Sequence, residues 1–111
     1  MNRKWKTVIV DDNILKAMDI RKALEWNGLQ DIAIVSCQEK LWDAIYAGRE
    51  NGAEVGLIVT DMHYPLTPGA APDEEAGFKL MERMEDIVNI LKKVQMVFFH
   101  IEDNAYFGKK A

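Results

Sequence analysis

The 111-residue chain has little of what marks several classes of protein. Cys37 is its one cysteine, so an internal disulfide is excluded and a reducing cytoplasm is the expected location. A single cysteine at the end of an apolar strand is expected to be a small core residue. No apolar run is long enough to cross a membrane, and residues 1–13 lack a signal-peptide cleavage pattern. A formal net charge of −4 offers no basic footprint for nucleic acid or an anionic membrane. With two histidines and no Cys-x-x-Cys spacing, no zinc site is expected.

The composition is that of an ordinary globular domain, with 49% hydrophobic and 29% charged residues, and the length fits one domain, residues 1–111. Short apolar runs alternate with segments whose apolar residues recur at helical spacing. This alternation implies right-handed crossovers and a doubly wound parallel sheet, an α/β fold. Strands are predicted at 6–10, 32–35, 55–60 and 94–99, and helices at 14–26, from Ser36 until a break at 48–52, and at 75–91.

The apolar spacing also predicts which helical residues face the core. Asn13 is expected to cap the first helix. Prolines and a glycine in residues 62–75 predict an irregular loop, of a length that is often functional. The inner residues are predicted to be Ile14, Ala17, Met18, Ala23 and Leu24 in the first helix, Leu41, Trp42, Ile45 and Tyr46 in the second, and Phe78, Met81 and Met84 in the third.

Two of the apolar runs end in aspartate. The first leads into Asp11 and Asp12, and the run at 57–60 leads into Asp61. Parallel strands finish at one edge of the sheet, where open α/β folds bind ligands, so neighbouring runs would bring three carboxylates together. No basic residue stands beside them in the sequence, and Mg²⁺ is the cation that such oxygen ligands favour. The alternative is that each aspartate only ends a strand or caps a helix.

Residues 6–13 (KTVIVDDN) and 57–65 (LIVTDMHYP) resemble the response-regulator receiver domain of two-component signalling. An acidic pair closes the first strand, one aspartate closes the third, and a proline follows that aspartate four residues later. Gly77 looks like the glycine at the start of the family's third helix, displaced by the inserted loop. The resemblance implies a flavodoxin-like fold and a signalling domain that is not an enzyme.

The same resemblance implies a role for each residue at the strand ends. Asp61 would accept a phosphoryl group from a histidine kinase or phosphotransfer protein. Mg²⁺ would be held by Asp11, Asp12, Asp61 and the main-chain carbonyl of His63. A phosphatase that uses an aspartyl phosphate would want a second aspartate two residues after the first, where His63 stands.

The chain departs from the family pattern at its C-terminal end. Phe99 or His100 stands where the family has a serine or threonine, and the chain stops before a fifth strand with its lysine and before a last helix. The expected strand order is therefore 2-1-3-4, with strand four exposed at an edge. Such an edge invites pairing, so a homodimer or another protein partner is expected. The alternative function is a receiver-like interaction module that works without phosphorylation.

Overall fold

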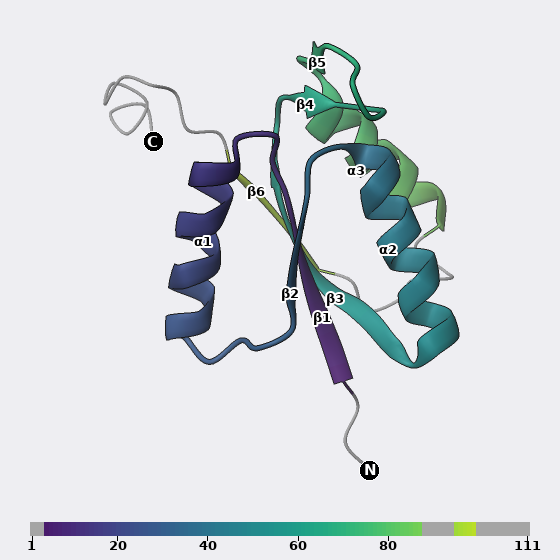
Figure 1. Ribbon diagram of the computed structural model, residues 1–111. Coiled ribbons are helices and arrows are strands. Elements are labelled where there is room, and N and C mark those ends of the chain that lie inside the picture. Colours follow the sequence, from purple (N-terminus) through teal and green to yellow (C-terminus); the bar gives the residue numbers. More distant parts are fainter. Residues whose placement is uncertain (1–3, 88–94, 100–111) are drawn as a thin grey trace.

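The computed structural model describes residues 4–87 and 95–99, with the side chains of residues 5–84 (Figure 1). Strands β1 (Lys4–Val10), β2 (Ile32–Val35) and β3 (Ala53–Asp61) form a parallel sheet in the order β2-β1-β3. On the other side of β3, the backbone of β6 (Gln95–Phe99) runs parallel to it. The predicted parallel α/β sheet is confirmed, and the arrangement is compatible with a flavodoxin-like fold.

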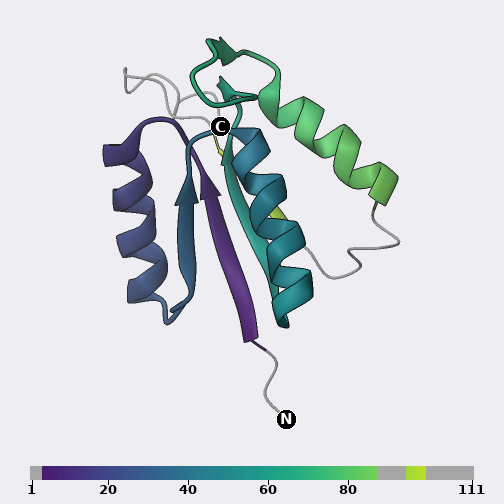
Figure 2. The same ribbon diagram turned by 45° about the vertical axis from the view of Figure 1, so that its right-hand side comes forward.

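Helices cover both faces of this sheet. Helix α1 (Ile14–Trp26) lies on one face, and α2 (Gln38–Asn51) and α3 (Ala76–Ile87) lie on the other (Figures 1 and 2). The side chain of Asn13 caps α1 as predicted, since its Oδ1 accepts the main-chain N–H of Lys16 at 3.1 Å. Within the described ranges, no helix is both long and apolar enough to cross a membrane.

Helix α2 differs from the prediction at both ends. Its N-cap is Cys37 and not Ser36, and the Cys37 side chain makes no capping hydrogen bond. The helix passes through Gly48, predicted as a breaker, and ends at Gly52, whose φ of 76° lies in the left-handed region that glycine favours. A Cβ at position 48 would collide with the main-chain carbonyl of Ala53. Gly48 therefore marks a close approach of β3 to α2.

The segment predicted as an irregular loop contains a short antiparallel pair. Strand β4 (Tyr64–Pro65) pairs with β5 (Pro72–Asp73), and Pro65 lies opposite Pro72. Two prolines are tolerated because the pair is only two residues long and needs few ladder hydrogen bonds. The main-chain N–H of Glu39 donates to the carbonyl of Leu66 at 3.0 Å, which fixes the segment to the start of α2.

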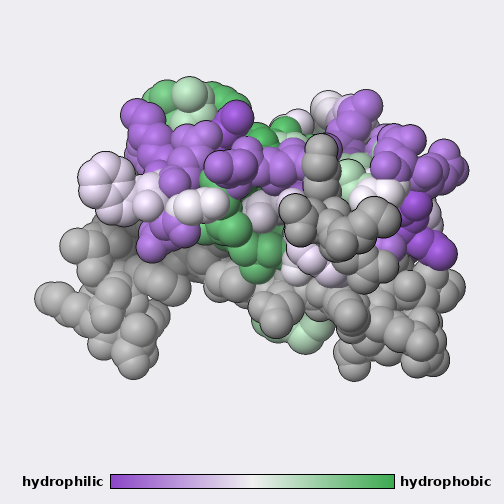
Figure 3. Space-filling view, turned by 90° about the horizontal axis from the view of Figure 1, so that it is seen from below, coloured by the Kyte–Doolittle hydropathy of each residue, from purple (hydrophilic) through white to green (hydrophobic). Residues whose placement is uncertain are grey.

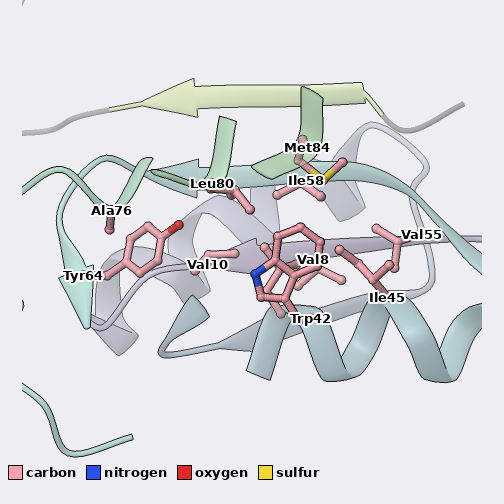
Figure 4. Packing of buried hydrophobic residues seen from close by; sticks show 11 residues of the cluster. Val8, Val10, Trp42, Ile45, Val55, Ile58, Tyr64, Ala76, Leu80 and Met84 are labelled. Carbon is pink, nitrogen blue, oxygen red and sulfur yellow. The ribbon is translucent and has the colours of Figure 1, made fainter. Parts of the chain in front are cut away.

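The larger part of the core lies between the sheet and the helices α2 and α3 (Figure 4). Trp42 and Ile45 reach from α2 towards β1 and β3, and Met84 reaches from α3. Seen from the end where the strands begin, hydrophobic residues come to the surface between hydrophilic areas (Figure 3). The buried residues of this part of the core are Val8, Val10, Leu41, Trp42, Ile45, Val55, Ile58, Tyr64, Ala76, Leu80 and Met84.

The predicted inner stripes are only partly correct. In α1, Ala17 is buried, but Ile14, Met18 and Ala23 are exposed. In α3 the buried residues are Ala76, Leu80 and Met84, four residues apart, so the stripe is rotated away from Phe78 and Met81, which are exposed. In α2, Leu41, Trp42 and Ile45 are buried and Tyr46 is exposed.

Candidate functional site

Three aspartates meet at the carboxyl edge of the sheet. Asp11 follows β1 and Asp61 ends β3, on strands whose register pairs Val10 with Thr60. A carboxylate oxygen from each of Asp11, Asp12 and Asp61 lies within 4.8 Å of the others. Asp11 and Asp61 are buried, and Asp12 is exposed. The convergence predicted from the two apolar runs is confirmed.

Main-chain donors fix two of these carboxylates. Asp11 Oδ1 accepts the N–H of Asn13 at 2.9 Å, and Asp61 Oδ1 accepts the N–H of Met62 at 2.7 Å. Hydrogen bonds from the adjacent backbone restrict each side chain to one orientation. The Oδ2 atoms of Asp11 and Asp61 both contact the same third group, the side chain of Lys16.

The ammonium group of Lys16 is a cation that the sequence prediction missed. Its Nζ donates to Asp61 Oδ2 at 3.0 Å and lies 3.2 Å from Asp11 Oδ2. Lys16 belongs to the first turn of α1, and helical side chains tilt towards the helix N-terminus, so this one is directed back to the strand ends. A sequence signal existed, because a lysine in a first turn stands at the positive end of the helix dipole, where cations are disfavoured.

The charge of Asp11 is incompletely compensated. Its Oδ2 is buried and accepts no hydrogen bond from the described residues, since the Lys16 contact is an ion pair without hydrogen-bond geometry. Burial raises the pKa of the Asp11 carboxyl, against the opposing effects of the Asn13 N–H and the Lys16 charge. Burial also acts to lower the pKa of Lys16, but its hydrogen bond to Asp61 and both carboxylate charges outweigh this and raise it. The raised pKa keeps Lys16 protonated beside the carboxylates.

The donor set fits a hard divalent cation such as Mg²⁺. Among the described residues, three carboxylates face the single ammonium of Lys16, so the donor set is rich in oxygen ligands. Magnesium binds carboxylate oxygens and keeps several waters, and the exposed side of the cluster at Asp12 leaves room for them. The buried Asp11 Oδ2 atom makes an ion pair with Lys16 but accepts no well-formed hydrogen bond among the described residues, and a metal ion could satisfy such an oxygen.

The other predicted site residues are placed less completely. His63 follows Asp61 by two residues and its side chain is exposed, while the role of its carbonyl as a ligand stays a prediction. The backbone of Phe99 lies opposite Asp61 in the register of β3 and β6, so strand β6 ends beside the site. His100, the other candidate for that position, lies outside the described residues.

A buried chain of hydrogen bonds runs from the end of β3 to α2. The Thr60 hydroxyl donates to the carbonyl of Asp61 at 2.8 Å, and its oxygen lies 3.2 Å from the Tyr64 hydroxyl. Gln38 Nε2 donates to Tyr64 at 3.4 Å, and Trp42 Nε1 donates to Gln38 Oε1 at 3.3 Å. Burial raises the pKa of Tyr64, which keeps its hydroxyl neutral. This network was not predicted, because the contact between Gln38 and Tyr64 that joins its two halves links segments distant in the sequence.

Helix α3 also holds the segment that follows Asp61. The N–H of Gly77 donates to the carbonyl of Met62 at 3.0 Å. A Cβ on Gly77 would lie 2.7 Å from Met62 Sδ and 3.1 Å from Met62 Cα, so the two backbones approach too closely for a larger residue to fit without a shift. The glycine singled out by the family resemblance therefore supports the strand end that carries Asp61.

A separate groove of about 500 Å³ lies along α2 and α3, and its lining does not include Asp11, Asp12 or Asp61. Trp42 and Tyr46 line it, and the Arg83 guanidinium stands 4.2 Å from the centre of a Trp42 ring. Its other polar lining residues include both acids, Glu39 and Asp43, and a base, Lys79. This mixture does not select one charge of ligand, so the acidic cluster is the stronger candidate site.

Comparisons with known proteins add no family assignment. No family model matches the chain, and no significantly similar protein was found among the curated proteins. The residues at the carboxyl edge and their geometry are therefore the features of the chain that point to a function.

Proposed function

We propose that the chain is a receiver-like signalling domain in which Asp61 accepts a phosphoryl group from a phosphohistidine of a histidine kinase or phosphotransfer protein. In this proposal the sheet has the receiver order 2-1-3-4, with β6 as the fourth strand. Mg²⁺ is held by Asp11, Asp12, Asp61 and the main-chain carbonyl of His63. The domain acts by contacting other proteins in the cytoplasm and has no nucleic-acid or membrane partner.

The convergence of Asp11, Asp12 and Asp61 supports this proposal most strongly. Their carboxylate oxygens lie within 4.8 Å at the edge where parallel α/β sheets bind ligands. Two of the three are buried, and burying like charges together is costly unless cations lie among them. Ending a strand or capping a helix would not require all three carboxylates in one place.

The chemistry follows from the positions of the charges. An oxygen of the Asp61 carboxylate attacks phosphorus, the bond from phosphorus to the donor imidazole nitrogen breaks, and the imidazole keeps the electron pair. Mg²⁺, when bound, supplies positive charge for the phosphoryl oxygens. The main-chain N–H of Met62 donates a hydrogen bond to Asp61 Oδ1 at 2.7 Å and thereby orients the carboxylate for attack. Water then hydrolyses the aspartyl phosphate, which makes the signal reversible.

The test is intact-mass spectrometry after incubation with acetyl phosphate and Mg²⁺. Wild type and Asp19→Asn, a control at an exposed residue of α1, should each gain one phosphoryl group. Asp61→Asn should gain none. An unmodified wild-type protein that is folded and supplied with Mg²⁺, or a phosphoryl group retained in Asp61→Asn, would contradict the proposal.

A second candidate function is a phosphorylation-independent interaction module. The observation that favours it is the exposure of apolar residues on α1, with Leu15 74% and Trp26 91% exposed. Large exposed apolar side chains on one helix are typical of protein contacts. This candidate predicts a homodimer or a complex with another protein that forms equally well with and without acetyl phosphate. A monomer by light scattering at micromolar concentration would contradict the homodimer.

A further inference from the structure

We propose that Lys16 is an internal counter-cation, which competes with a divalent ion for the Oδ2 atoms of Asp11 and Asp61. Metal then enters the site only when the Lys16 ammonium leaves it. The inference rests on the metal site of the proposed function and adds a regulation of that site by the chain itself.

The distances make the two cations alternatives. Lys16 Nζ lies 3.0 Å from Asp61 Oδ2 and 3.2 Å from Asp11 Oδ2, and so bridges the two strands. Mg²⁺ binds carboxylate oxygens at about 2.1 Å, and a Mg²⁺ ion that joined both Oδ2 atoms would take the space between them. An ammonium and a divalent ion in contact with the same two oxygens would also repel each other strongly. Only one of them can bridge this pair of oxygens at a time.

The place of Lys16 in α1 indicates what holds it there. The first turn of α1 contains no acidic residue, and the helix dipole disfavours a cation at this end. Among the described residues, the carboxylates of Asp11 and Asp61 stabilise the ammonium, and a metal ion that neutralises them weakens this attraction. The main-chain N–H of Lys16 remains bonded to the Asn13 cap, so the side chain can leave without unwinding the helix.

The Lys16 side chain also has a route out of the site. It is 18% exposed, whereas the Asp11 side chain is fully buried. Rotation about its flexible stem carries the ammonium into water while the stem stays on the protein surface. Because metal binds only the fraction of molecules in which Lys16 has left, the apparent metal affinity is reduced by that fraction.

The experiment compares metal affinity in three proteins. Free Mn²⁺ is followed by electron paramagnetic resonance, and Mg²⁺ is then added to displace bound Mn²⁺. Lys16→Met, which keeps an unbranched side chain but removes the charge, should bind both ions at least tenfold more tightly than wild type. Lys22→Met, the same change at an exposed residue of α1, should bind like wild type. Equal affinity in all three, weaker binding by Lys16→Met, or no binding by any of them would overturn the competition.

A second measurement uses the unsubstituted protein and does not depend on the folding of Lys16→Met. Nitrogen-15 NMR of the lysine ammonium groups should show the Lys16 signal, assigned with Lys16→Arg, moving and saturating as Mg²⁺ is added. A Lys16 signal unchanged at saturating Mg²⁺ would overturn the proposal. Neither experiment involves phosphate, so a chain that exchanges Lys16 for metal but gains no phosphoryl group would contradict the proposed function alone.

Discussion

The two faces of the sheet differ in how many buried hydrophobic residues the structure describes on them. Among the described side chains, a cluster of eleven buried hydrophobic residues lies between the sheet and the helices α2 and α3, whereas the cluster on the α1 face has four, Ile9, Ala17, Ile32 and Val59. Asp61 is held from the first side, because the N–H of Gly77 donates to the carbonyl of Met62 and the Thr60 hydroxyl donates to the carbonyl of Asp61. The cation Lys16 comes from the second side, on α1, where Leu15 and Trp26 are exposed. An acidic edge fixed by main-chain hydrogen bonds and a lysine on a flexible stem suit an exchangeable site.

The largest expected effect comes from making the same truncation on both faces. Met84→Ala, in the α3 core, should lower the free energy of unfolding by about 2 kcal/mol or more, because it leaves a cavity. Met18→Ala on α1, where the side chain is 47% exposed, should change it by less than about 0.5 kcal/mol. Urea denaturation of the two variants measures both values, and similar losses would contradict the difference between the faces.

The buried polar network on the α2 and α3 side should give the next largest effect. Gln38→Met keeps the volume but leaves Trp42 Nε1 and the Tyr64 hydroxyl each short of a partner. We expect a loss of about 1–3 kcal/mol in unfolding free energy. Gln30→Met, at an exposed position, is the matched control and should have almost no effect. Equal stability of both variants in urea would show that the network does not stabilise the fold.

Changes to the exposed apolar residues of α1 should affect association and not folding. Leu15 and Trp26 lie eleven residues apart, which places them on one side of the helix. The double variant Leu15→Gln, Trp26→Gln should unfold within about 0.5 kcal/mol of wild type. Light scattering then shows whether this surface holds a second copy, because self-association of wild type should be lost in the variant. A stability loss well beyond 0.5 kcal/mol would mean that these residues belong to the core.

The smallest effect is expected at an ion pair beside α3. Lys79 Nζ donates a hydrogen bond to Asp73 Oδ2 at 2.6 Å, and the main-chain N–H of Glu75 donates one to Asp73 Oδ1. Both hydrogen bonds lower the pKa of Asp73 from the ordinary value of 3.8. The resulting stabilisation is present above that value and is lost as the pH falls through the lower folded-state pKa. Thermal denaturation should show that the Tm of wild type exceeds that of Asp73→Asn at neutral pH and that this difference shrinks below pH 4. A constant difference across that range would contradict the assignment. The effect is small because the pair is exposed to solvent.

Local sequence patterns were enough to predict the positions of the strands and of the acidic edge. Apolar β-branched runs that end in aspartate specify both where β1 and β3 stop and which residues meet there, and Asn13 capped α1 as expected. These features depend on neighbours in the sequence. They also explain why the convergence of Asp11, Asp12 and Asp61 could be inferred before the structure.

Features that depend on packing between distant segments were missed. Gly48 reads as a helix breaker, yet its role is to let Ala53 pass close to α2. The inward face of α3 follows Ala76 and Leu80 and not the larger Phe78, and Gly77 lies on this side in close contact with Met62. Lys16 was overlooked because it is not adjacent to an aspartate in sequence, although the direction of side chains in a first helical turn brings it to the site.

The central claim is that Asp61 is the reactive residue of the acidic edge, and chemical trapping tests it most directly. Wild-type protein is incubated briefly with acetyl phosphate and Mg²⁺ and then treated with hydroxylamine, whose nitrogen attacks the acyl carbon and releases phosphate. Peptide mapping should locate the resulting hydroxamate at Asp61, with none at Asp11 or Asp12. A hydroxamate at another carboxylate, or none in a folded protein, would contradict the account.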